Sequence, residues 1–407
     1  MTATDATITP APRPSFAILV AISAIGPLAL NLFIPSMPGL EKTFAVPYGT
    51  VQLTLTLYLI GMAVCQLIYG PASDKFGRRP LLLAGLSLFF IASVLAAIAP
   101  TIETLIAARL IQAIGGSAGI VLARAMVRDV YTREKSASMI SYITMAFVVA
   151  PMIAPVLGGF LEQYASWRHG FWILAGFGAI VLTATWATLP ETHVARGTDP
   201  QNFFRNAGHL FALPRFRAYT FTLGFTSCVF FAFLGGAPHI MMNVLKRTPV
   251  EYGLWFLTIS VAYMAGNFLS GRYTIKFGLD RMVLAGCAVT VGGGFLCLAA
   301  AVTGFLAPAT LFLPMSLAAF GNGLTIPNAT AGAISVDSRM TGAAAGWSGF
   351  TQMAFGSIAS QLVGSLQTAW PLAVFWFMAV ASMLALLTHW LAKAFLKNWS
   401  YPRVWSK

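Results

Sequence analysis

Residues 81–99 read LLLAGLSLFFIASVLAAIA, nineteen residues without a charged side chain. A helix of about twenty apolar residues spans the hydrocarbon core of a bilayer. Similar runs recur along the whole chain, in which 57% of the 407 residues are hydrophobic and only 9% are charged. Because these runs are continuous, whereas barrel strands alternate apolar and polar residues, the sequence predicts an all-α membrane protein.

Twelve apolar runs are predicted as transmembrane helices. They cover residues 15–36, 51–70, 81–99, 104–127, 142–161, 171–189, 219–243, 253–274, 282–305, 310–335, 342–365 and 370–392. The first run follows a polar tail with one cation, Arg13, so a cleaved signal peptide is the competing interpretation. The eleven later spans favour retention of this segment as a transmembrane helix.

The basic residues predict the orientation. With the N-terminus in the cytoplasm, nineteen Lys and Arg side chains fall in cytoplasmic segments and four on the opposite side. The positive-inside rule then places both termini in the cytoplasm, and we expect a multi-pass protein of the bacterial inner membrane. The net charge of +13 does not indicate nucleic-acid binding, because the bases lie in short loops between spans.

The chain is predicted to consist of two pseudo-symmetric six-helix bundles. GPASDKFGRRPLLLAG at 70–85 aligns without gaps to GRYTIKFGLDRMVLAG at 271–286, and seven of sixteen positions are identical. The longest polar interval is rich in turn residues and separates the halves. The expected parts are a tail 1–14, a bundle 15–189, a cytoplasmic linker 190–218, a bundle 219–392 and a tail 393–407. Secondary transporters with this architecture rock one half against the other.

The composition offers little support for enzymatic chemistry. The four cysteines lie inside apolar runs, without disulfide or metal-ligand spacing, so we expect no metal and no cofactor. A membrane enzyme would need clustered ligands or a nucleophile with its base near one membrane face. The sequence contains no such constellation and no nucleotide-binding P-loop.

The turn between the second and third spans, GPASDKFGRRP at 70–80, resembles the G-x-x-x-D-x-x-G-R-R signature of the major facilitator superfamily. Glycines permit close helix approach and a tight turn, which we expect at Gly70 and Gly77. Asp74 and Arg78 are expected to form a charge cluster that latches one conformation. The gating residues are therefore predicted to be Gly70, Asp74, Gly77, Arg78, Arg79 and Asp129. The alternative is that both arginines are simple inside-positive anchors.

Two further spans resemble motifs of the same superfamily. LIAARLIQAIGGSAG at 105–119 is similar to its R-x-x-Q-G pattern, and a charge such as Arg109 inside an apolar helix marks a transport pathway or a structural partner. APMIAPVLGG at 150–159 resembles the G-P-x-x-G-G motif of antiporters, with Ala154 in place of glycine. The antiporter motif residues are Pro151, Ala154, Pro155, Gly158 and Gly159. This resemblance favours export.

Within the superfamily, the chain resembles the drug:proton antiporters of the bicyclomycin, chloramphenicol and florfenicol resistance type. The resemblance includes NLFIPSMP at 31–38, ARAMVRD at 123–129 and WRHGF at 167–171. In that group the first span usually carries an acidic residue, and this chain has Asn31 at the matching position. None of the twelve acidic residues lies at the middle of a predicted span. The coupling candidates are then His239, Arg124, Asp129 and Asp337.

Polar and aromatic residues near the middle of cavity-lining spans are predicted to contact the substrate. They are Asn31, Phe33, Tyr58, Arg109, Gln112, Phe230, Phe231, Asn322 and Gln352. For the aromatic residues, lipid exposure or packing is the competing explanation. Buried arginines without a carboxylate at the membrane midplane favour a neutral or weakly anionic solute over a lipophilic cation.

These features predict a monomeric secondary transporter in the lipid bilayer that exports small amphipathic drugs, with protons as the coupling ion. The alternative is a transporter of one metabolite, nucleoside-like or a weak organic acid, acting as an importer or a facilitator. Asn31 strengthens that alternative. A passive channel or receptor is disfavoured, because the repeat and the gating motif suit alternating access.

Overall fold

The computed structural model describes residues 14–131, 133–192, 200–337 and 340–395, and these residues contain helices and no β-strand. The first half comprises α1 (Phe16–Phe33), η1 (Ile34–Ser36), α2 (Met37–Phe44), α3 (Tyr48–Phe76), α4 (Arg78–Ala97), α5 (Ile102–Val130), α6 (Arg133–Tyr164) and α7 (Trp167–Thr188). The second half comprises α9 (Pro214–His239), η2 (Ile240–Val244), α10 (Pro249–Phe277), α11 (Leu279–Val302), α12 (Pro308–Ile334), α13 (Thr341–Leu366) and α14 (Ala373–Phe395). Between the halves lies α8 (Pro200–Ala212).

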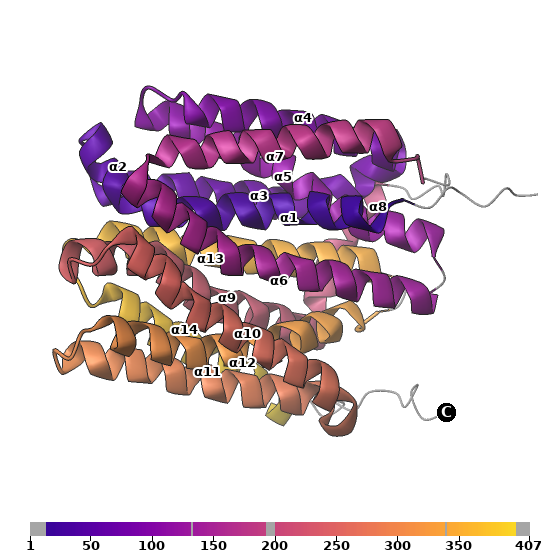
Figure 1. Cartoon of the computed structure of the whole chain (residues 1–407). Helices are drawn as coiled ribbons and strands as arrows, with labels where there is room; N and C mark the ends of the chain where they lie inside the picture. The colour runs from indigo at the N-terminus through magenta and orange to yellow at the C-terminus, as the bar shows by residue number, and fades with distance from the viewer. Residues whose placement is uncertain (1–13, 132, 193–199, 338–339, 396–407) are drawn as a thin grey trace, which may run out of the picture.

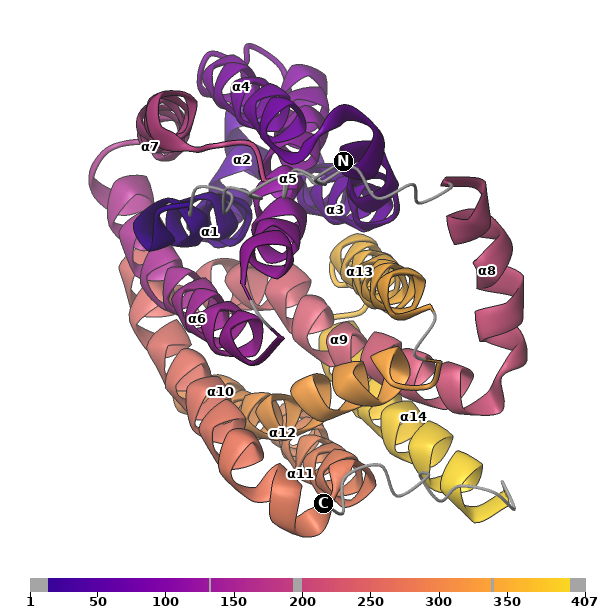
Figure 2. The ribbon, with the colours of Figure 1, turned by 90° about the vertical axis from the view of Figure 1, so that its right-hand side faces the viewer.

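The long helices run side by side in two bundles, one of α1 to α7 and one of α9 to α14 (Figure 1). We call the end of the molecule that carries α2 the α2 end, and the opposite end, which carries α8, the linker end (Figure 1). The end-on view shows where the bundles meet, with α13 beside α3 and α6 beside α10 (Figure 2). This arrangement is the predicted pair of six-helix bundles.

Ten helical segments of the described residues are long and apolar enough to cross a bilayer, and α6 and α13 complete the twelve spans. The lower hydropathy of α13 has a physical reason. This helix packs against α3 and α9, and its polar side chains Ser360 and Gln361 are used in contacts with α3. A helix that is covered by protein does not need an apolar surface toward lipid.

The interval predicted as a linker, 190–218, contains more helix than its composition suggested. It includes α8, and α9 begins within it at Pro214, five residues before the predicted start of the seventh span at 219. Proline suits the first helical position, because its missing N–H would have no intrahelical partner there. The predicted tails, 1–14 and 393–407, lie almost entirely outside the described residues.

The internal repeat is visible in the backbone. Gly77 and Gly278 occupy equivalent positions and both have positive φ, 90° and 81°, which favours glycine. Each of these turns connects two antiparallel spans of its half. The next helix crossings also match, because α4 meets α5 and α11 meets α12 at pairs of glycines. The similarity of the halves therefore extends from sequence to packing.

Both crossings need glycine for steric reasons. A Cβ on Gly115 would lie 2.5 Å from the carbonyl oxygen of Gly85, and a Cβ on Gly321 would lie 2.5 Å from that of Gly286. Backbone atoms cannot move aside as a flexible side chain does. Without a hydrophobic driving force between helices in lipid, such close packing is a main source of stability.

The two halves are joined at the α2 end by hydrogen bonds between α3 and the second bundle. The Tyr48 hydroxyl donates to the Gly235 carbonyl at 3.0 Å, and Gln52 Nε2 donates to Ser360 Oγ at 2.6 Å. Further along α3, Gln66 Nε2 donates to the Gly349 carbonyl at 3.4 Å. The contacts of Tyr48 and Gln52 must break if the halves separate at the α2 end.

We expect Gly321→Ala to lower the free energy of unfolding by about 1–3 kcal/mol, because the added methyl group overpacks the crossing of α11 and α12. The control is Gly292→Ala on α11, where a Cβ would meet nothing within 4 Å. Thermal unfolding of both variants in the same detergent is the measurement. Equal melting temperatures for the two variants would show that the crossing does not depend on glycine.

Candidate transport and gating sites

Arg109 is a fully buried cation in the first bundle. Its side chain is 0% exposed, and its Nη1 donates to the Ala29 carbonyl at 3.1 Å and to Gln112 Oε1 at 2.5 Å. Its Nε and Nη2 groups have no hydrogen-bond partner among the described residues. A buried charge of this kind is costly unless something compensates it.

Three aromatic rings surround the Arg109 guanidinium. Its central carbon lies 4.1 Å from the centre of the Tyr58 ring, 4.7 Å from that of Phe33 and 5.7 Å from that of Phe171. Ring faces attract a cation within about 6 Å, and the attraction is larger when both groups are desolvated. Aromatic rings, rather than a carboxylate, therefore provide part of the compensation.

Hydrogen bonds to neighbouring helices hold this site in place. Gln112 Nε2 donates to Ser93 Oγ of α4 at 2.8 Å, and the Tyr58 hydroxyl donates to the Gly26 carbonyl of α1 at 2.9 Å. Side chains from α1, α3, α4, α5 and α7 thus meet around Arg109. Of these groups, Ser93 belongs to no motif, and Phe171 lies in the segment WRHGF at 167–171 but was not predicted to line the site.

Asn31 is buried on α1, with 3% of its surface exposed. Its Nδ2 donates to the Pro27 carbonyl at 2.8 Å, while its Oδ1 has no hydrogen-bond partner. The following residue, Leu32, lies close to α6. A Cβ on Gly158 of α6 would clash with the Leu32 carbonyl. The position that carries an acid in the resembling exporters thus holds a neutral amide with one free acceptor.

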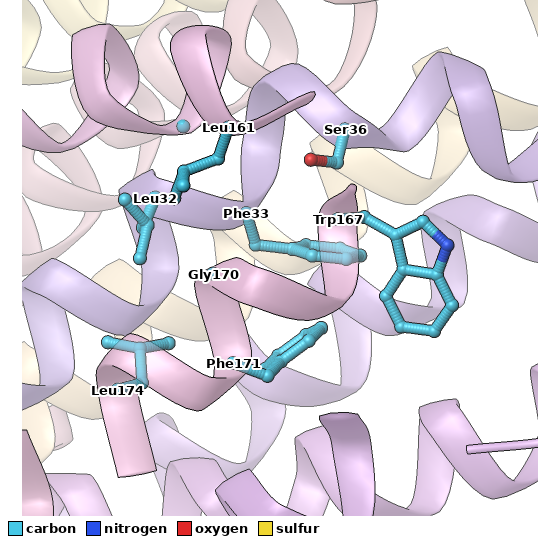
Figure 3. A pocket seen from close by; sticks show the side chains of 9 residues that line it. Leu32, Phe33, Ser36, Leu161, Trp167, Gly170, Phe171 and Leu174 are labelled. Atoms are coloured by element: carbon cyan, nitrogen blue, oxygen red, sulfur yellow. The ribbon is translucent and has the colours of Figure 1, made fainter. Parts of the chain in front are cut away.

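A small cavity lies between α1, α6 and α7, beside the Phe33 and Phe171 rings (Figure 3). Its volume is about 10 Å³, which is enough for about one water molecule. The two ring centres are 5.4 Å apart, and Trp167 packs edge-on against Phe171 at 6.0 Å. The same two rings approach Arg109, so the cavity adjoins the arginine site but does not hold a drug-sized solute in this conformation.

The predicted substrate contacts of the second half lie on α9, α12 and α13. Phe230 and Phe231 pack edge to face at 5.4 Å, and Gln352 is half-buried on α13. Asn322 is buried and accepts a hydrogen bond from Thr290 Oγ1 at 3.1 Å. Its carbonyl oxygen is therefore used in the crossing of α11 and α12.

The gating residues form a charge cluster inside the first half. Arg78 lies between two carboxylates, with Nη1 2.6 Å from Asp74 Oδ1 and Nε 3.0 Å from Asp129 Oδ2, and it also contacts Ser73. These residues connect the ends of α3, α4 and α5 at the linker end. The expected close helix approach at Gly70 is wrong for this conformation, because a Cβ there would meet nothing within 4 Å.

Glu191 is a member of the cluster that the motif did not reveal. Its two carboxylate oxygens accept hydrogen bonds from the backbone N–H groups of Arg78 and Arg79, each at 3.1 Å. It thereby caps the N-terminus of α4, where the helix dipole favours a negative charge. Arg79 in turn donates from Nη2 to the Trp186 carbonyl at 2.7 Å. Glu191 follows α7 directly and is separated from the motif by more than a hundred residues.

The antiporter motif on α6 faces α1 on one side and the second bundle on the other. A Cβ on Gly159 would clash with the Pro249 carbonyl, and a Cβ on Gly253 would lie 2.5 Å from the Pro155 carbonyl. Ala154 is fully buried and Pro151 is half-buried. The motif therefore supplies the small residues that let α6 and α10 touch near the α2 end.

The coupling candidates lie far apart along the chain and in different surroundings. His239 lies at the α2 end, where its Nδ1 is 3.6 Å from Glu41 Oε2 of the other half. Asp129 is paired with Arg78, and Arg124 is an exposed residue of α5. Asp337 follows α12 and is half-buried.

Two bundles of six spanning helices, related by an internal repeat, define the architecture of a secondary transporter rather than that of an enzyme. The family model of the Major Facilitator Superfamily matches residues 19–360, and the chain belongs to this superfamily. A D-xylose–proton symporter of known crystal structure superimposes with a TM-score of 0.75 at 16% identity, covering 92% of this chain and 96% of that chain. This likeness shows the fold alone.

Curated relatives cover most of the chain. An uncharacterized MFS-type transporter, YdgK, of Bacillus subtilis is 31% identical over 88% of this chain and 90% of its own length. A bicyclomycin resistance protein homolog of Haemophilus influenzae is 27% identical over 85% of this chain and 87% of its own length. Multidrug resistance protein D of Escherichia coli is 29% identical over 87% of this chain and 88% of its own length. The resemblance to drug-resistance transporters is thus confirmed.

We expect Glu191→Ala to destabilise the protein by about 1 kcal/mol, because it removes the cap and the favourable charge at the start of α4. Glu103→Ala is the matched control, since Glu103 is exposed in the first turn of α5, a helix that Thr101 and Thr104 already cap. Thermal unfolding of the two purified variants checks the difference. A loss for Glu103→Ala as large as that for Glu191→Ala would contradict the assignment.

Proposed function

We propose that this protein exports small amphipathic drug-like compounds across the bacterial inner membrane by proton-coupled antiport. Two relatives whose names refer to bicyclomycin resistance and multidrug resistance support the substrate class. The antiporter motif on α6 supports the direction of transport. The excess of basic residues at the linker end supports a cytoplasmic location for that end and for both termini. We propose a monomer as the transporting unit.

The observation that carries the substrate proposal is the buried Arg109 with two unpartnered donors and an aromatic surrounding. A solute with an acceptor oxygen, such as a carbonyl, nitro or carboxylate group, would satisfy these donors. A flat ring on the solute would pack against the aromatic side chains. A lipophilic cation would instead meet a like charge, which costs free energy in a medium of low dielectric constant.

Solutes have access to this site only if the bundle opens, because Arg109, Tyr58 and Gln112 are completely buried here. The contacts between the halves at the α2 end support our proposal that this end is the closed side. With the linker end in the cytoplasm, the solute enters from the cytoplasm and leaves after the hydrogen bonds of Tyr48 and Gln52 to the second half break. This cycle is the alternating access that the two-bundle architecture serves.

The coupling ion is proposed to be the proton, although Asn31 removes the usual carrier of the resembling exporters. Asp129 is occupied by Arg78, so we assign it to the gating cluster rather than to coupling. Arg124 and Asp337 remain coupling candidates near the linker end. His239 belongs to the contact between the halves at the α2 end.

A second candidate function is transport of one metabolite by import or facilitated diffusion. The observation that favours it is the neutral amide of Asn31, whose Nδ2 is bound to the Pro27 carbonyl. A carrier without a titratable group in its first span has lost one common route of proton coupling. The same Arg109 site would then select a weak organic acid or a nucleoside-like solute.

The decisive experiment is transport by purified protein in liposomes that contain a pH-sensing dye. We expect amphenicols and aromatic carboxylates to cause proton movement and tetraphenylphosphonium to cause none. Arg109→Ala should lower the transport rate at least tenfold. This factor corresponds to a loss of about 1.4 kcal/mol in free energy. Tyr58→Phe, which keeps the ring, should transport faster than Tyr58→Leu, which removes it.

Cation-selective transport by the wild-type protein would contradict the substrate proposal. Solute flux without proton movement would favour the facilitator. Arg109→Lys keeps the charge, and if it restores transport relative to Arg109→Ala, a mere folding defect does not explain the loss. Asn31→Asp tests whether an acid at this position increases proton movement per solute.

A further inference from the structure

The first span continues beyond α1 into a short arm, residues 34–44. After α1, the chain passes through η1 and α2, and two prolines, Pro35 and Pro38, break the helical hydrogen bonding. On one side the arm rests on α6 of its own half, where the Glu162 carboxylate lies directly against Gly39 of the arm. On its other side Glu41 reaches the second half. The arm therefore lies between the two bundles at the α2 end.

Three polar side chains connect the arm with the second half. Asn243 Nδ2 donates to Glu41 Oε2 at 2.9 Å and lies 3.0 Å from His239 Nδ1. The side chains of His239 and Glu41 are only 13% and 21% exposed. The Tyr48 ring packs on the imidazole, with the ring centres 4.9 Å apart. Asn243 thus bridges a carboxylate of one half and an imidazole of the other.

The geometry of this bridge depends on protons. An amide NH₂ group has two N–H donors, so Asn243 donates one to the Glu41 carboxylate and the other to a lone pair of His239 Nδ1. That arrangement requires a neutral imidazole that carries its proton on Nε2. A proton added to Nδ1 would displace the amide N–H of Asn243, and the imidazolium would then form an ion pair with Glu41 Oε2, which lies 3.6 Å from Nδ1. If the amide is rotated instead, the same distances require a protonated Glu41.

The local backbone differs from an ordinary helix end. Asn243 lies in η2, a π-helical turn in which the Leu245 N–H donates to the Ile240 carbonyl at 2.8 Å. Turns of this kind are rare and are frequently found at functional sites. Lys246, just after the turn, has a positive φ of 55°, which is uncommon for a side chain of this size. The segment that carries the bridge is therefore conformationally unusual.

Few other charged groups act on the imidazole. Lys246 is the nearby cation of the second half, and Lys42 is an exposed neighbour of Glu41 on the arm. Tyr48 from α3 is a titratable neighbour of the imidazole. Gln367, which directly follows α13, lies beside Tyr48 and is uncharged. Arg247 is paired with Glu251, with 3.9 Å between Arg247 Nε and Glu251 Oε2. Among the described residues, Glu41 is therefore the anion that faces His239 at this site.

We propose that Glu41, His239 and Asn243 form a proton-binding gate, in which an ion pair between protonated His239 and Glu41 holds the α2 end closed and a neutral imidazole leaves only the weaker Asn243 bridge. The inference rests on the proposed function for its orientation, in which the α2 end faces the periplasm. Acid on that side then favours closure of the exit. Histidine is the side chain suited to such a response, because small changes in its surroundings decide its charge between about pH 5 and pH 8.

Distances between spin labels on the two halves test the gate without any substrate. Suitable label sites at the α2 end are Ile98 and Phe305, both exposed and both in the connections that follow α4 and α11. They are replaced by cysteine in a full-length chain whose four native cysteines are changed to alanine. Pulsed electron resonance at about pH 8 and about pH 5, the two limits of the histidine range, measures the populations of short and long distances between the labels.

The wild-type background should show a severalfold smaller population of the long distance at the lower pH. His239→Gln and Glu41→Gln should each abolish this pH response, because each removes one member of the ion pair. Asn243→Ala, which removes the bridge of the neutral state, should increase the long-distance population at the higher pH. His169→Gln, which changes an exposed histidine at the start of α7, should leave the response intact. The variants serve as tests only after size-exclusion chromatography shows them to be folded and monodisperse.

A pH-independent distance distribution in the wild-type background would overturn the gate, and so would a response that persists in His239→Gln. An opposite response, with the α2 end opening in acid, would overturn it as well. The measurement uses no solute, so a wrong substrate class leaves its result unchanged. Conversely, drug export in liposomes with a pH-insensitive gate would retain the proposed function and remove only this inference.

Discussion

Every polar backbone group of a membrane-spanning chain must find its partner inside the protein, and this constraint governs the whole structure. Helices satisfy it within each span, and the remaining polar groups collect at the helix ends and at the contacts between helices. In the absence of a hydrophobic force between spans, glycines such as Gly115 and Gly321 bring the backbones together. A charge at the centre of a bundle is then the exception, and Arg109 is such a charge.

The two halves share their packing and differ in their chemistry. Gly85 and Gly286 occupy the same place in the repeat and the same kind of helix crossing. The first half adds the Arg78 cluster at its linker end. In the second half, Leu279 replaces the arginine, and Asp280 accepts from the Tyr219 hydroxyl at 2.5 Å and lies 3.4 Å from His389 Nε2. The arginine-centred charge cluster is thus a feature of the first half.

The fold could be predicted from the sequence because its signals are local. The apolar runs, the repeat and the glycine turns at Gly77 and Gly278 are each visible within a few tens of residues. The motif that carries Asp74 and Arg78 also predicted that these two side chains would lie close together. By contrast, the amino-acid sequence gives no local sign that one side of α13 packs against α3 and α9. It also gives no sign that α1 continues into an arm.

The candidate site was less predictable, because its partners come from distant segments. Tyr58 and Phe33 were expected to face a cavity, but the structure places their rings around Arg109. Glu191 and Glu41 were not singled out, since each acts on residues more than a hundred positions away. Asn322 is a polar residue in mid-span that serves helix packing. Such assignments depend on rotation about the helix axis, which composition does not determine.

The central claim is that solute crosses only when the halves separate at the α2 end. Gly49 on α3 and Ser365 on α13 are suited to test it, because a Cβ on Gly49 would lie 3.4 Å from the Ser365 Cβ, close to the spacing in a disulfide. The double variant Gly49→Cys and Ser365→Cys is made in a background without other cysteines. Oxidation to the disulfide should stop transport, and reduction of the disulfide should restore it. Transport at an unchanged rate through the oxidised protein would contradict the account.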